Sequence, residues 1–374
     1  MRIVIAPDKF KGCLTATQVA AAIARGIRDA LPDAIIDQIP LADGGEGTVD
    51  ALVAATQGRL LTRRVTGPLP GMQVDATFGI LGDNRTAVIE MAAASGLHLL
   101  RPDQYNPEKT TTYGTGELIL AAAQLGAKEI ILGIGGSATT DAGVGCAQAC
   151  GITFSADGKT ITTPLTGGHL VRHTFVVNSK HNLGDTELLV ACDVNNPLYG
   201  PRGAARVFGP QKGATPEQVE QLDAALDRLA QSTGNEGLAH DPGAGAAGGL
   251  GFGLLAFLGA KLVPGFDLIA RTLHLQKRIC GADLVITGEG RLDASSLHGK
   301  TPVGVARLCK ELHIPCIALV GAVGDGADGA LAEGITQYLA IAAPSMPLTQ
   351  AMARAPEFLQ CAAQRLLRDW SRVR

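Results

Sequence analysis

Residues 283–302 read DLVITGEGRLDASSLHGKTP, and this stretch decides how the rest of the chain is interpreted. Its apolar start, residues 283–287, predicts a short buried strand, and the glycines that follow predict a loop. Thr301-Pro302 then predicts the start of a helix, with Thr301 at the N-cap and Pro302 at the first helical position. The stretch therefore has the pattern of a βα unit of an α/β protein.

The loop of this βα unit carries charges of both signs, namely Glu289, Arg291, Asp293 and Lys300. The free backbone N–H groups at a helix start, beside a lysine, suit an anion such as phosphate. Carboxylates in the same loop would repel phosphate unless Mg²⁺ lies between them. The combination is what phosphoryl transfer from MgATP requires.

Composition excludes several classes of protein. The chain has 374 residues, 46% of them hydrophobic, which is enough for two domains or one large one. A net charge of −3, no basic stripe and 4% aromatic residues argue against nucleic acid as a partner. The N-terminus has the pattern of a strand rather than a signal peptide, and no apolar run is long enough for a membrane span. With eight scattered cysteines, interpreted as reduced, we expect a cytoplasmic protein.

Short β-type runs separated by helical patterns occupy both ends of the chain. This alternation favours a parallel, doubly wound sheet. The expected strands are residues 3–6, 34–39, 284–287, 316–320 and 337–341, and the expected helices are residues 16–30, with Thr15 as N-cap, 302–312, 326–333 and 347–370.

The middle of the chain has a different pattern, with antiparallel strands divided by Gly/Pro and Gly/Asp/Asn turns. We expect one α/β domain formed by residues 1–60 and 278–374, and an inserted α/β domain with a mixed sheet at residues 61–277. The expected elements of the insert are strands at 63–66, 73–80, 86–91, 129–133 and 188–192, helices at 114–125 and 216–233, and a closely packed helix at 243–259.

Two polar motifs follow the first two expected strands. Asp8, Lys9 and Lys11 come after the first, and Asp43 and Glu46 lie among three glycines after the second. In open α/β sheets, ligands bind at the carboxyl ends of the strands. Each motif alone could be a solvated or capped turn, but glycines around carboxylates allow a close backbone approach to a ligand. We therefore interpret both motifs as parts of a binding site.

A third motif, residues 133–143, joins a strand to a helix and is rich in glycine and small hydroxyl residues. Such a loop forms a natural nest for an anion. Asp141 within it could hold Mg²⁺ or cap the next helix, and the sequence leaves both readings open. The candidate ligand contacts of this loop are Gly135, Gly136, Ser137 and Thr139.

Two further candidates are Asp193, which ends a strand, and Lys212, a candidate contact for phosphate or carboxylate. Asp193 could instead form an Asx turn before proline, with a purely structural role. Residues 243–248 fit G-x-G-x-x-G, but no clear strand precedes them, so a nicotinamide site is not expected. Residues 294–301 fit a relaxed P-loop pattern, but they do not follow their strand directly. They are interpreted as a phosphate-binding helix start outside the P-loop fold.

Taken together in order, these motifs resemble the bacterial type I glycerate kinase family over essentially the whole chain. Any one motif is weak, whereas the ordered set is specific. Lys9 and Ser295 depart from the family pattern, in which Ser and Gln are expected. The motifs are residues 6–8 with 10–12, 42–48, 114–117, 135–139, 193 with 196–198, 208–214, 242–249 and 288–300.

The resemblance implies ATP-dependent phosphorylation of D-glycerate, with O2 favoured as acceptor, and a flavodoxin-like domain beside the inserted α/β domain. We expect MgATP and glycerate to meet in the cleft between the domains. The triphosphate would be held by the loop at 135–139 or by the helix start, and the sequence leaves both open. The expected roles are catalysis for Asp193, Glu289, Lys11 and Arg291, Mg²⁺ coordination for Asp193, Glu289 and Asp293, and substrate or ATP binding for Asp8, Lys9, Asp43, Glu46, Gly135, Gly136, Ser137, Thr139, Lys212, Gly299, Lys300 and Thr301.

Other functions stay open at this point. The same kinase could give 3-phosphoglycerate, or the chain could bind a hydroxy-carboxylate without catalysis. A nicotinamide-dependent dehydrogenase is disfavoured by its glycine motif. No nucleic-acid or membrane partner is expected, and the sequence leaves monomer and homodimer open.

Overall fold

The computed structural model describes residues 1–177, 180–297, 299–343 and 345–373, and these form two compact units. Unit 1 comprises residues 1–43, 50–57 and 266–374, and unit 2 comprises residues 44–49 and 58–265. Both ends of the chain therefore belong to unit 1. The chain passes from one unit to the other after residues 43, 49, 57 and 265.

Unit 1 contains a five-stranded sheet in the order β14-β13-β12-β1-β2, and every neighbouring pair is parallel. Counted along the chain within this unit, the order is 2-1-3-4-5, which is the flavodoxin-like arrangement. The predicted fold is confirmed. The strands are β1 (Arg2–Ile5), β2 (Ile35–Gln38), β12 (Leu284–Leu292), β13 (Cys316–Val323) and β14 (Gln337–Ala340), and the helices are α1 (Ala16–Ala30), α2 (Thr48–Thr56), α10 (Gly265–Thr272), α11 (Leu275–Ile279), η5 (Ala294–Leu297), α12 (Thr301–Glu311), α13 (Gly329–Ala332), α14 (Leu348–Ala353) and α15 (Ala355–Val373).

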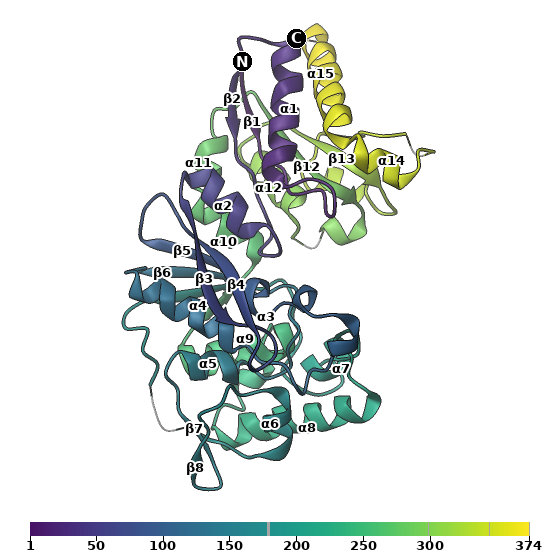
Figure 1. Cartoon of the computed structure of the whole chain (residues 1–374). Coiled ribbons are helices and arrows are strands. Elements are labelled where there is room, and N and C mark those ends of the chain that lie inside the picture. Colours follow the sequence, from purple (N-terminus) through teal and green to yellow (C-terminus); the bar gives the residue numbers. More distant parts are fainter. Residues whose placement is uncertain (178–179, 298, 344, 374) are drawn as a thin grey trace. The chain divides into compact units, whose positions relative to one another are not determined.

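Helices α1 and α15 lie side by side over one face of this sheet (Figure 1). Ile5 and Ile286 of neighbouring strands are fully buried beneath them, together with Ile23 of α1 and Leu359 of α15. Helix α1 begins as predicted after Thr15, whose side chain accepts a hydrogen bond from the Gln18 backbone N–H in a capping box. A parallel sheet is typically buried on both faces, which explains the apolar runs at residues 3–5 of β1 and 316–320 of β13.

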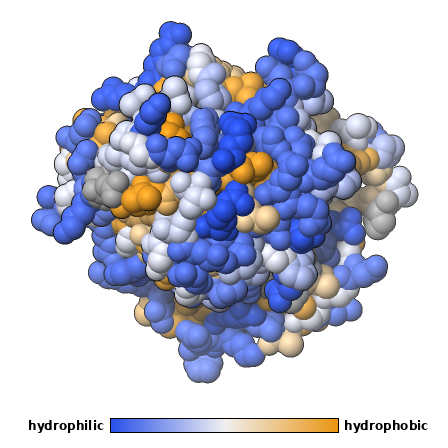
Figure 2. Space-filling view, turned by 90° about the horizontal axis from the view of Figure 1, so that it is seen from below, coloured by the Kyte–Doolittle hydropathy of each residue, from blue (hydrophilic) through white to orange (hydrophobic). Residues whose placement is uncertain are grey.

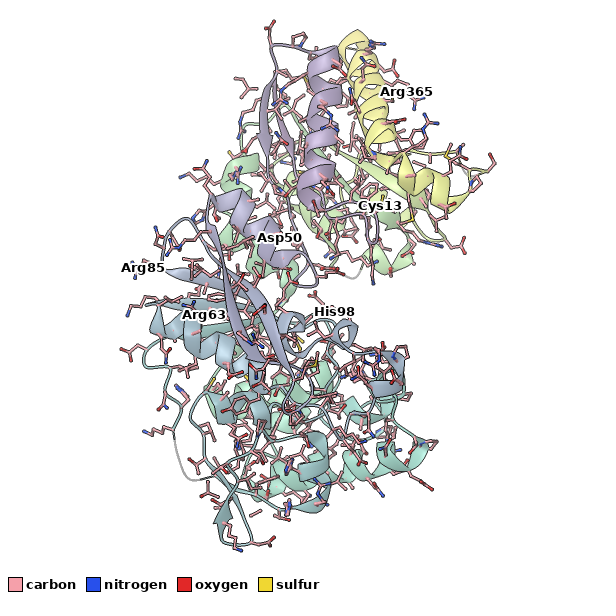
Figure 3. All side chains as sticks on the ribbon, in the orientation of Figure 1. Cys13, Asp50, Arg63, Arg85, His98 and Arg365 are labelled. Atoms are coloured by element: carbon pink, nitrogen blue, oxygen red, sulfur yellow. The ribbon has the colours of Figure 1, made fainter. Side chains whose placement is uncertain are left out.

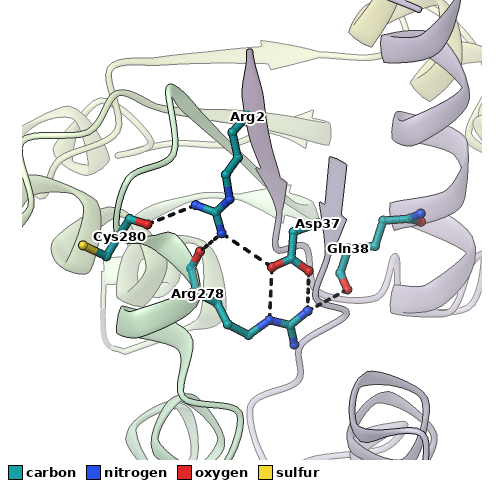
Figure 4. A network of polar contacts seen from close by, with 5 residues as sticks. All are labelled: Arg2, Asp37, Gln38, Arg278 and Cys280. Carbon is teal, nitrogen blue, oxygen red and sulfur yellow. Dashed lines mark hydrogen bonds and ion pairs between the residues drawn. The ribbon is translucent and has the colours of Figure 1, made fainter. Parts of the chain in front are cut away.

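A polar network joins the two chain ends within unit 1 (Figure 4). Arg278 of α11 donates through Nε and Nη2 to the carboxylate of Asp37 on β2. Arg2 of β1 donates to the carbonyls of Arg278 and Cys280 and lies 3.9 Å from Asp37. The bidentate arginine–carboxylate geometry fixes residues that are more than 200 positions apart in the sequence.

Unit 2 contains a six-stranded mixed sheet in the order β11-β10-β6-β5-β4-β3, in which β3 and β4 are antiparallel and β5, β6, β10 and β11 are parallel. The expected mixed sheet is confirmed, and a small antiparallel sheet, β8-β7-β9, was missed. The elements are β3 (Arg59–Thr66), β4 (Gln73–Ile80), β5 (Thr86–Glu90), α3 (Ala92–Ser95), η1 (Leu97–Leu99), η2 (Pro102–Gln104), α4 (Tyr113–Gln124), β6 (Glu129–Gly133), α5 (Val144–Ala149), β7 (Phe154–Ala156), β8 (Lys159–Thr160), α6 (Gly167–Arg172), β9 (Val176–Val177), β10 (Glu187–Ala191), α7 (Ala204–Phe208), η3 (Pro210–Lys212), α8 (Pro216–Ser232), η4 (Leu238–His240), α9 (Ala246–Leu258) and β11 (Lys261–Val263).

Exposed arginines lie at one edge of the unit 2 sheet. Strand β3 is an edge strand, and its Arg63 is exposed, as is Arg85 before β5 (Figure 3). Charged residues on an edge strand disfavour pairing with another chain. The face drawn in Figure 2 is mostly hydrophilic, with small separate apolar patches. Among the described residues, no helix has the length and apolar character needed to cross a membrane.

Helix α9 differs from the regular helix expected over residues 243–259. Ala247, Gly248 and Gly249 have φ values of 53°, 72° and 86°, so the regular part begins after them. The reason is a close backbone approach: a Cβ on Gly248 would lie 1.9 Å from the carbonyl oxygen of Thr139. The glycines therefore let this segment pack directly against the loop that follows β6.

Gly248→Ala is expected to destabilise the protein by roughly 3 kcal/mol or more. The left-handed backbone costs about 1–2 kcal/mol for alanine, and the clash with Thr139 adds overpacking strain of about 1–3 kcal/mol. Gly259→Ala is the matched control, because its φ is 64° and a Cβ there meets nothing within 4 Å. Urea denaturation followed by circular dichroism measures both. Equal losses for the two variants would contradict the packing argument.

Candidate functional site

In unit 1, the candidate residues lie where the strand order changes direction. Strands β1 and β12 are neighbours, although the chain between them forms β2 and all of unit 2. Asp8 follows β1, and its backbone N–H donates to the Gly288 carbonyl of β12 at 2.8 Å. The carboxyl ends of the strands at such a switch point are the usual ligand site of this fold class.

The sequence prediction of a loop from Gly288 to Asp293 is wrong. Strand β12 continues to Leu292, and Glu289 and Arg291 pair with Val320 and Ala322 of β13. The prediction failed because Gly288 was expected to end the strand, whereas β12 continues through it. Gly288 instead allows a close approach of the strands, since a Cβ there would lie 2.2 Å from the Leu319 carbonyl oxygen.

Asp8 is a buried carboxyl group with two hydrogen bonds. Asp8 is only 7% exposed. Oδ2 accepts from the Thr301 hydroxyl at 2.8 Å, and Oδ1 accepts from the Lys9 backbone N–H at 2.7 Å. Burial raises the pKa of Asp8 to about 6, and the negative charge of Asp43 acts in the same direction. A group that is costly to ionise without a cation is typical of a functional site.

Glu289 is the second buried carboxyl group at this edge, and its residue is also 7% exposed. Burial raises the pKa of Glu289 to about 7, and the charges of Asp8 and Asp293 add to the increase. A hydrogen bond of 2.6 Å from the hydroxyl of Ser296 to Oε1 opposes it, as does the charge of Lys300. Asp8, Asp43, Glu289 and Asp293 are called the acid cluster below.

Two cations of unit 1, Arg291 and Lys300, interact with the acid cluster. Arg291 is paired with Asp293 at 3.2 Å, and its side chain is 67% exposed. Lys300 donates to the hydroxyl of Ser295 at 2.8 Å, and that hydroxyl donates to Asp293 at 2.5 Å. Lys11 is exposed, as is Arg291. These two side chains are therefore accessible to an anion from solution.

The helix start beside the acid cluster differs by one residue from the prediction. Lys300 is the N-cap of α12, and Thr301 is its first residue, so Thr301 does not cap the helix. Its hydroxyl donates to Asp8 instead of accepting from the helix backbone. The buried carboxylate is the stronger acceptor, and the N-cap has no side-chain hydrogen bond.

Ser296 was missed from the sequence because nothing in its local pattern shows that its hydroxyl reaches Glu289. It is fully buried. Ser296→Ala is expected to cost about 1–3 kcal/mol of stability, because it removes the donor to a buried carboxyl group. Ser295→Ala, at an exposed position, should cost within about 0.5 kcal/mol. Chemical denaturation measures the free energy of unfolding of both variants. Equal losses in Ser296→Ala and Ser295→Ala would show that the bond from Ser296 to Glu289 does not contribute to stability.

In unit 2, the parallel strands β5, β6 and β10 end beside the glycine loop, defined here as Gly135–Thr139. The segment 44–49 of this unit packs on the same strand ends. A Cβ on Gly44, whose φ is 90°, would lie 2.4 Å from the Cβ of Ala191, the last residue of β10. The backbone N–H of Val49 donates to Glu90 at the end of β5. The segment that includes Gly44 and Glu46 therefore lies at the carboxyl ends of these strands, with Glu46 exposed.

Lys212 of η3 lies beneath the glycine loop and is only 1% exposed. Its Nζ donates to the hydroxyl oxygen of Ser137 at 2.8 Å and to the Thr139 carbonyl at 2.6 Å. Burial lowers the pKa of Lys212 to about 7, and the nearby charge of Asp141 opposes the decrease. The predicted contact residue is thus tied to the loop itself.

Asp141, for which the sequence left two readings, is fully buried and bound by the protein. Its oxygens accept from the backbone N–H and hydroxyl of Thr112, both at 2.8 Å, and from the Gly143 N–H at 3.2 Å. Burial raises the pKa of Asp141. These bonds assign it to holding the turn before α5.

Asp193 stands just after β10 and is exposed. Its Oδ1 accepts a hydrogen bond of 2.8 Å from the backbone N–H of Gly265, the first residue of α10. A carboxylate at a helix start is stabilised in its ionised form. Asp193 is therefore anchored at one oxygen.

The structure places the predicted site residues in two groups, one in each unit. Within the described ranges, no cluster of three or more His, Cys, Asp or Glu side chains is arranged as a metal site. The unit 1 group contains Asp8, Lys9, Lys11, Asp43, Glu289, Arg291, Asp293, Gly299, Lys300 and Thr301, and the unit 2 group contains Glu46, Gly135, Gly136, Ser137, Thr139, Asp193 and Lys212.

Comparisons with known proteins agree on one family. A sequence model of the Glycerate kinase family matches residues 3–371. Glycerate kinase of Haemophilus influenzae is 47% identical over 375 residues, covering 98% of each chain. Glycerate kinase of Bacillus subtilis is 46% identical over 369 residues, covering 97% of this chain and 96% of that protein. Glycerate 2-kinase of Escherichia coli is 49% identical over 332 residues, covering 87% and 86%.

A solved structure agrees with this assignment. The crystal structure of a Salmonella typhimurium LT2 protein, described as a glycerate kinase 2, superposes with a TM-score of 0.90 and 44% sequence identity. The match covers 99% of this chain and 98% of that one. The likeness therefore extends over both units.

Proposed function

Because the chain belongs to the glycerate kinase family, we propose that it transfers a phosphoryl group from ATP to D-glycerate and forms 2-phosphoglycerate. The E. coli relative is named glycerate 2-kinase, which supports O2 as the acceptor oxygen. The observation that carries most weight is the acid cluster at the flavodoxin-like switch point, with two buried carboxyl groups of raised pKa.

The acid cluster has the donor chemistry that Mg²⁺ prefers. Burial is the main cause of the raised pKa values of Asp8 and Glu289. Repulsion among the carboxylates adds to the increase, and a bound cation would relieve that repulsion. Mg²⁺ commonly uses one or two carboxylates together with substrate phosphates, so a complete protein cage is not required. We propose Asp293 as a ligand, and Glu289 and Asp193 each either as a ligand or as the group that accepts the hydroxyl proton. When bound, Mg²⁺ would neutralise charge on the phosphates.

Glu289 has the properties of a general base for the glycerate hydroxyl. A pKa of about 7 leaves it able to accept a proton near neutral pH, which is the optimum for such a group. The hydroxyl of Ser296 holds one carboxylate oxygen and leaves the other for a proton. Asp193 is the second candidate for this role, because one of its oxygens is anchored by Gly265.

The cations of unit 1 suit the anionic groups of the substrates. Arg291 and Lys11 are exposed, and Lys9 and Lys300 are half-buried. Arg291 can bind a carboxylate with its bidentate fork, although it must exchange its bond to Asp293. Lys11, Lys9 and Lys300 can neutralise charge that develops on the transferred group. Variants in either unit test these assignments separately.

The direct test is to incubate the protein with MgATP and D-glycerate, measure ADP and identify the product by ³¹P NMR. Glycerate-dependent ADP with phosphate on O2 is expected. Phosphate on O3 would still support a glycerate kinase but would contradict O2 as the acceptor oxygen. Calorimetric binding of glycerate without ADP formation would instead favour a non-catalytic hydroxy-carboxylate-binding protein.

A further inference from the structure

Buried Lys212 and half-buried Ser137 form a hydrogen-bonded pair in which the proton of the Ser137 hydroxyl is not used. A hydroxyl group has one proton to donate and two lone pairs to accept with. Because Lys212 donates to the oxygen of Ser137 at 2.8 Å, the Ser137 proton is left for another acceptor. Among the described residues, no further hydrogen bond of the Ser137 hydroxyl occurs.

The loop around Ser137 is open on one side and buried on the other. Gly135 and Gly136 are exposed, and Ser137 is half-buried. Gly136 has a φ of 73°, which orients successive backbone N–H groups as in an anion nest. Behind them, Lys212 supplies a positive charge that no solvent reaches directly. A ligand would therefore meet N–H and O–H donors backed by a cation.

A second observation indicates that the bonding of this loop is incomplete within the protein. The hydroxyl oxygens of Thr139 and Thr140 are fully buried, and neither has a hydrogen-bond partner among the described residues. Buried polar atoms are almost always paired in native proteins, so such exceptions are typical of binding sites or ordered water. Thr139 is the last residue of this loop and Thr140 follows it, so both exceptions lie close to Ser137 in the sequence.

We propose that Gly135, Gly136 and Ser137, backed by Lys212, form an oxyanion subsite that takes up a proton when an anion binds. The proton is bound by the Lys212 amine, which acts through Ser137 and is a positioning residue. The subsite rests on the proposed function for its two candidate occupants, which are the carboxylate of glycerate and the phosphates of ATP. Both present oxyanions of the kind that this arrangement would recognise.

The direction of proton transfer follows from the surroundings of Lys212. Burial holds its pKa at about 7, and Asp141 is the charged group that raises it. Asp141 accepts hydrogen bonds from Thr112 and Gly143, which favour its charged form, whereas its burial raises its pKa. An anion bound at Ser137 adds a second negative charge and raises the pKa of Lys212 further. Binding should therefore take up a proton at about pH 8 and almost none at about pH 6, where Lys212 is already charged.

Isothermal titration calorimetry in buffers of different ionisation enthalpy measures this uptake. D-glycerate alone and MgATP alone are titrated separately, so that the anion with proton uptake identifies the occupant. Lys212→Met should abolish the uptake and weaken binding of that anion by about tenfold or more. Ser137→Ala should weaken binding while the fold is kept. Lys261→Met, which removes an exposed lysine paired with Glu187 at the far end of β10, should match the wild type.

The outcomes separate this proposal from the proposed function. Uptake that disappears in Lys212→Met supports the subsite, whether or not the chain forms ADP with glycerate. Wild-type affinity for both anions in Ser137→Ala, or binding without uptake at about pH 8, would overturn it even if the kinase is active. Failure of the wild type to bind either anion would overturn it as well. Should Lys212→Met unfold, as judged by circular dichroism, Ser137→Ala decides.

Discussion

Glu289→Gln is expected to lower kcat for glycerate-dependent ADP formation by about 10²-fold or more. This is the scale of a lost general base. Gln keeps an oxygen that can accept the hydrogen bond from Ser296, and its volume is nearly the same, so the site should keep its shape. Steady-state kinetics with ADP detection measures kcat and KM. A larger change in KM than in kcat would assign Glu289 to binding instead of proton transfer.

The same variant should be more stable than the wild type in alkaline solution. Because the pKa of Glu289 is raised from 4.5 to about 7, folding is linked to proton binding, and stability decreases as pH rises through this interval. Gln does not ionise, so Glu289→Gln should gain on the order of 1–3 kcal/mol at about pH 8 and nothing at about pH 4. Denaturation in the presence of a metal chelator measures this. Glu311→Gln, at an exposed position, is the control for both experiments.

Asp193→Asn is expected to lower kcat by on the order of 10²-fold while leaving the fold intact. The amide oxygen of Asn can still accept the hydrogen bond from Gly265, so the start of α10 should be retained. What is lost is the negative charge, which either Mg²⁺ coordination or proton transfer requires. Near-wild-type turnover would remove Asp193 from the catalytic residues.

The Mg²⁺ dependence of activity separates the two roles of Asp193. If Asp193 is a ligand, Asp193→Asn should need a higher Mg²⁺ concentration for half-maximal activity, whereas loss of a base lowers kcat at every Mg²⁺ concentration. Asp185→Asn is the matched control. It lies just before β10, at the opposite end of the strand from Asp193, and it is exposed. Unchanged kinetics are expected there.

The helices and strands were largely predictable because the sequence patterns that specify them are local. The capping box at Thr15 and the apolar spacing after it give α1 its observed bounds, Ala16–Ala30. Strands β4 and β6 also have their predicted bounds, since turn residues lie on both sides of each strand-forming segment. The resemblance to glycerate kinases added the flavodoxin-like order, which depends on how distant strands pair.

The site was only partly predictable, because its key contacts join residues that are far apart in sequence. The motifs around Asp8 and Glu289 were found, but nothing in the sequence gives their burial or the raised pKa values that result from it. The bond from Thr301 to Asp8 spans 293 positions. The role of Ser296 depends on a turn that brings its hydroxyl to Glu289.

By itself, the sequence determined the α/β class, the alternation of strands and helices, and the residue types that phosphoryl transfer requires, because each follows from local composition and spacing. Tertiary structure alone decided that Glu289 belongs to a strand and that Lys212 lies buried beneath Ser137. Strand pairing and desolvation are properties of neighbours in space. They set the charge state of these groups, which the order of residues along the chain does not specify.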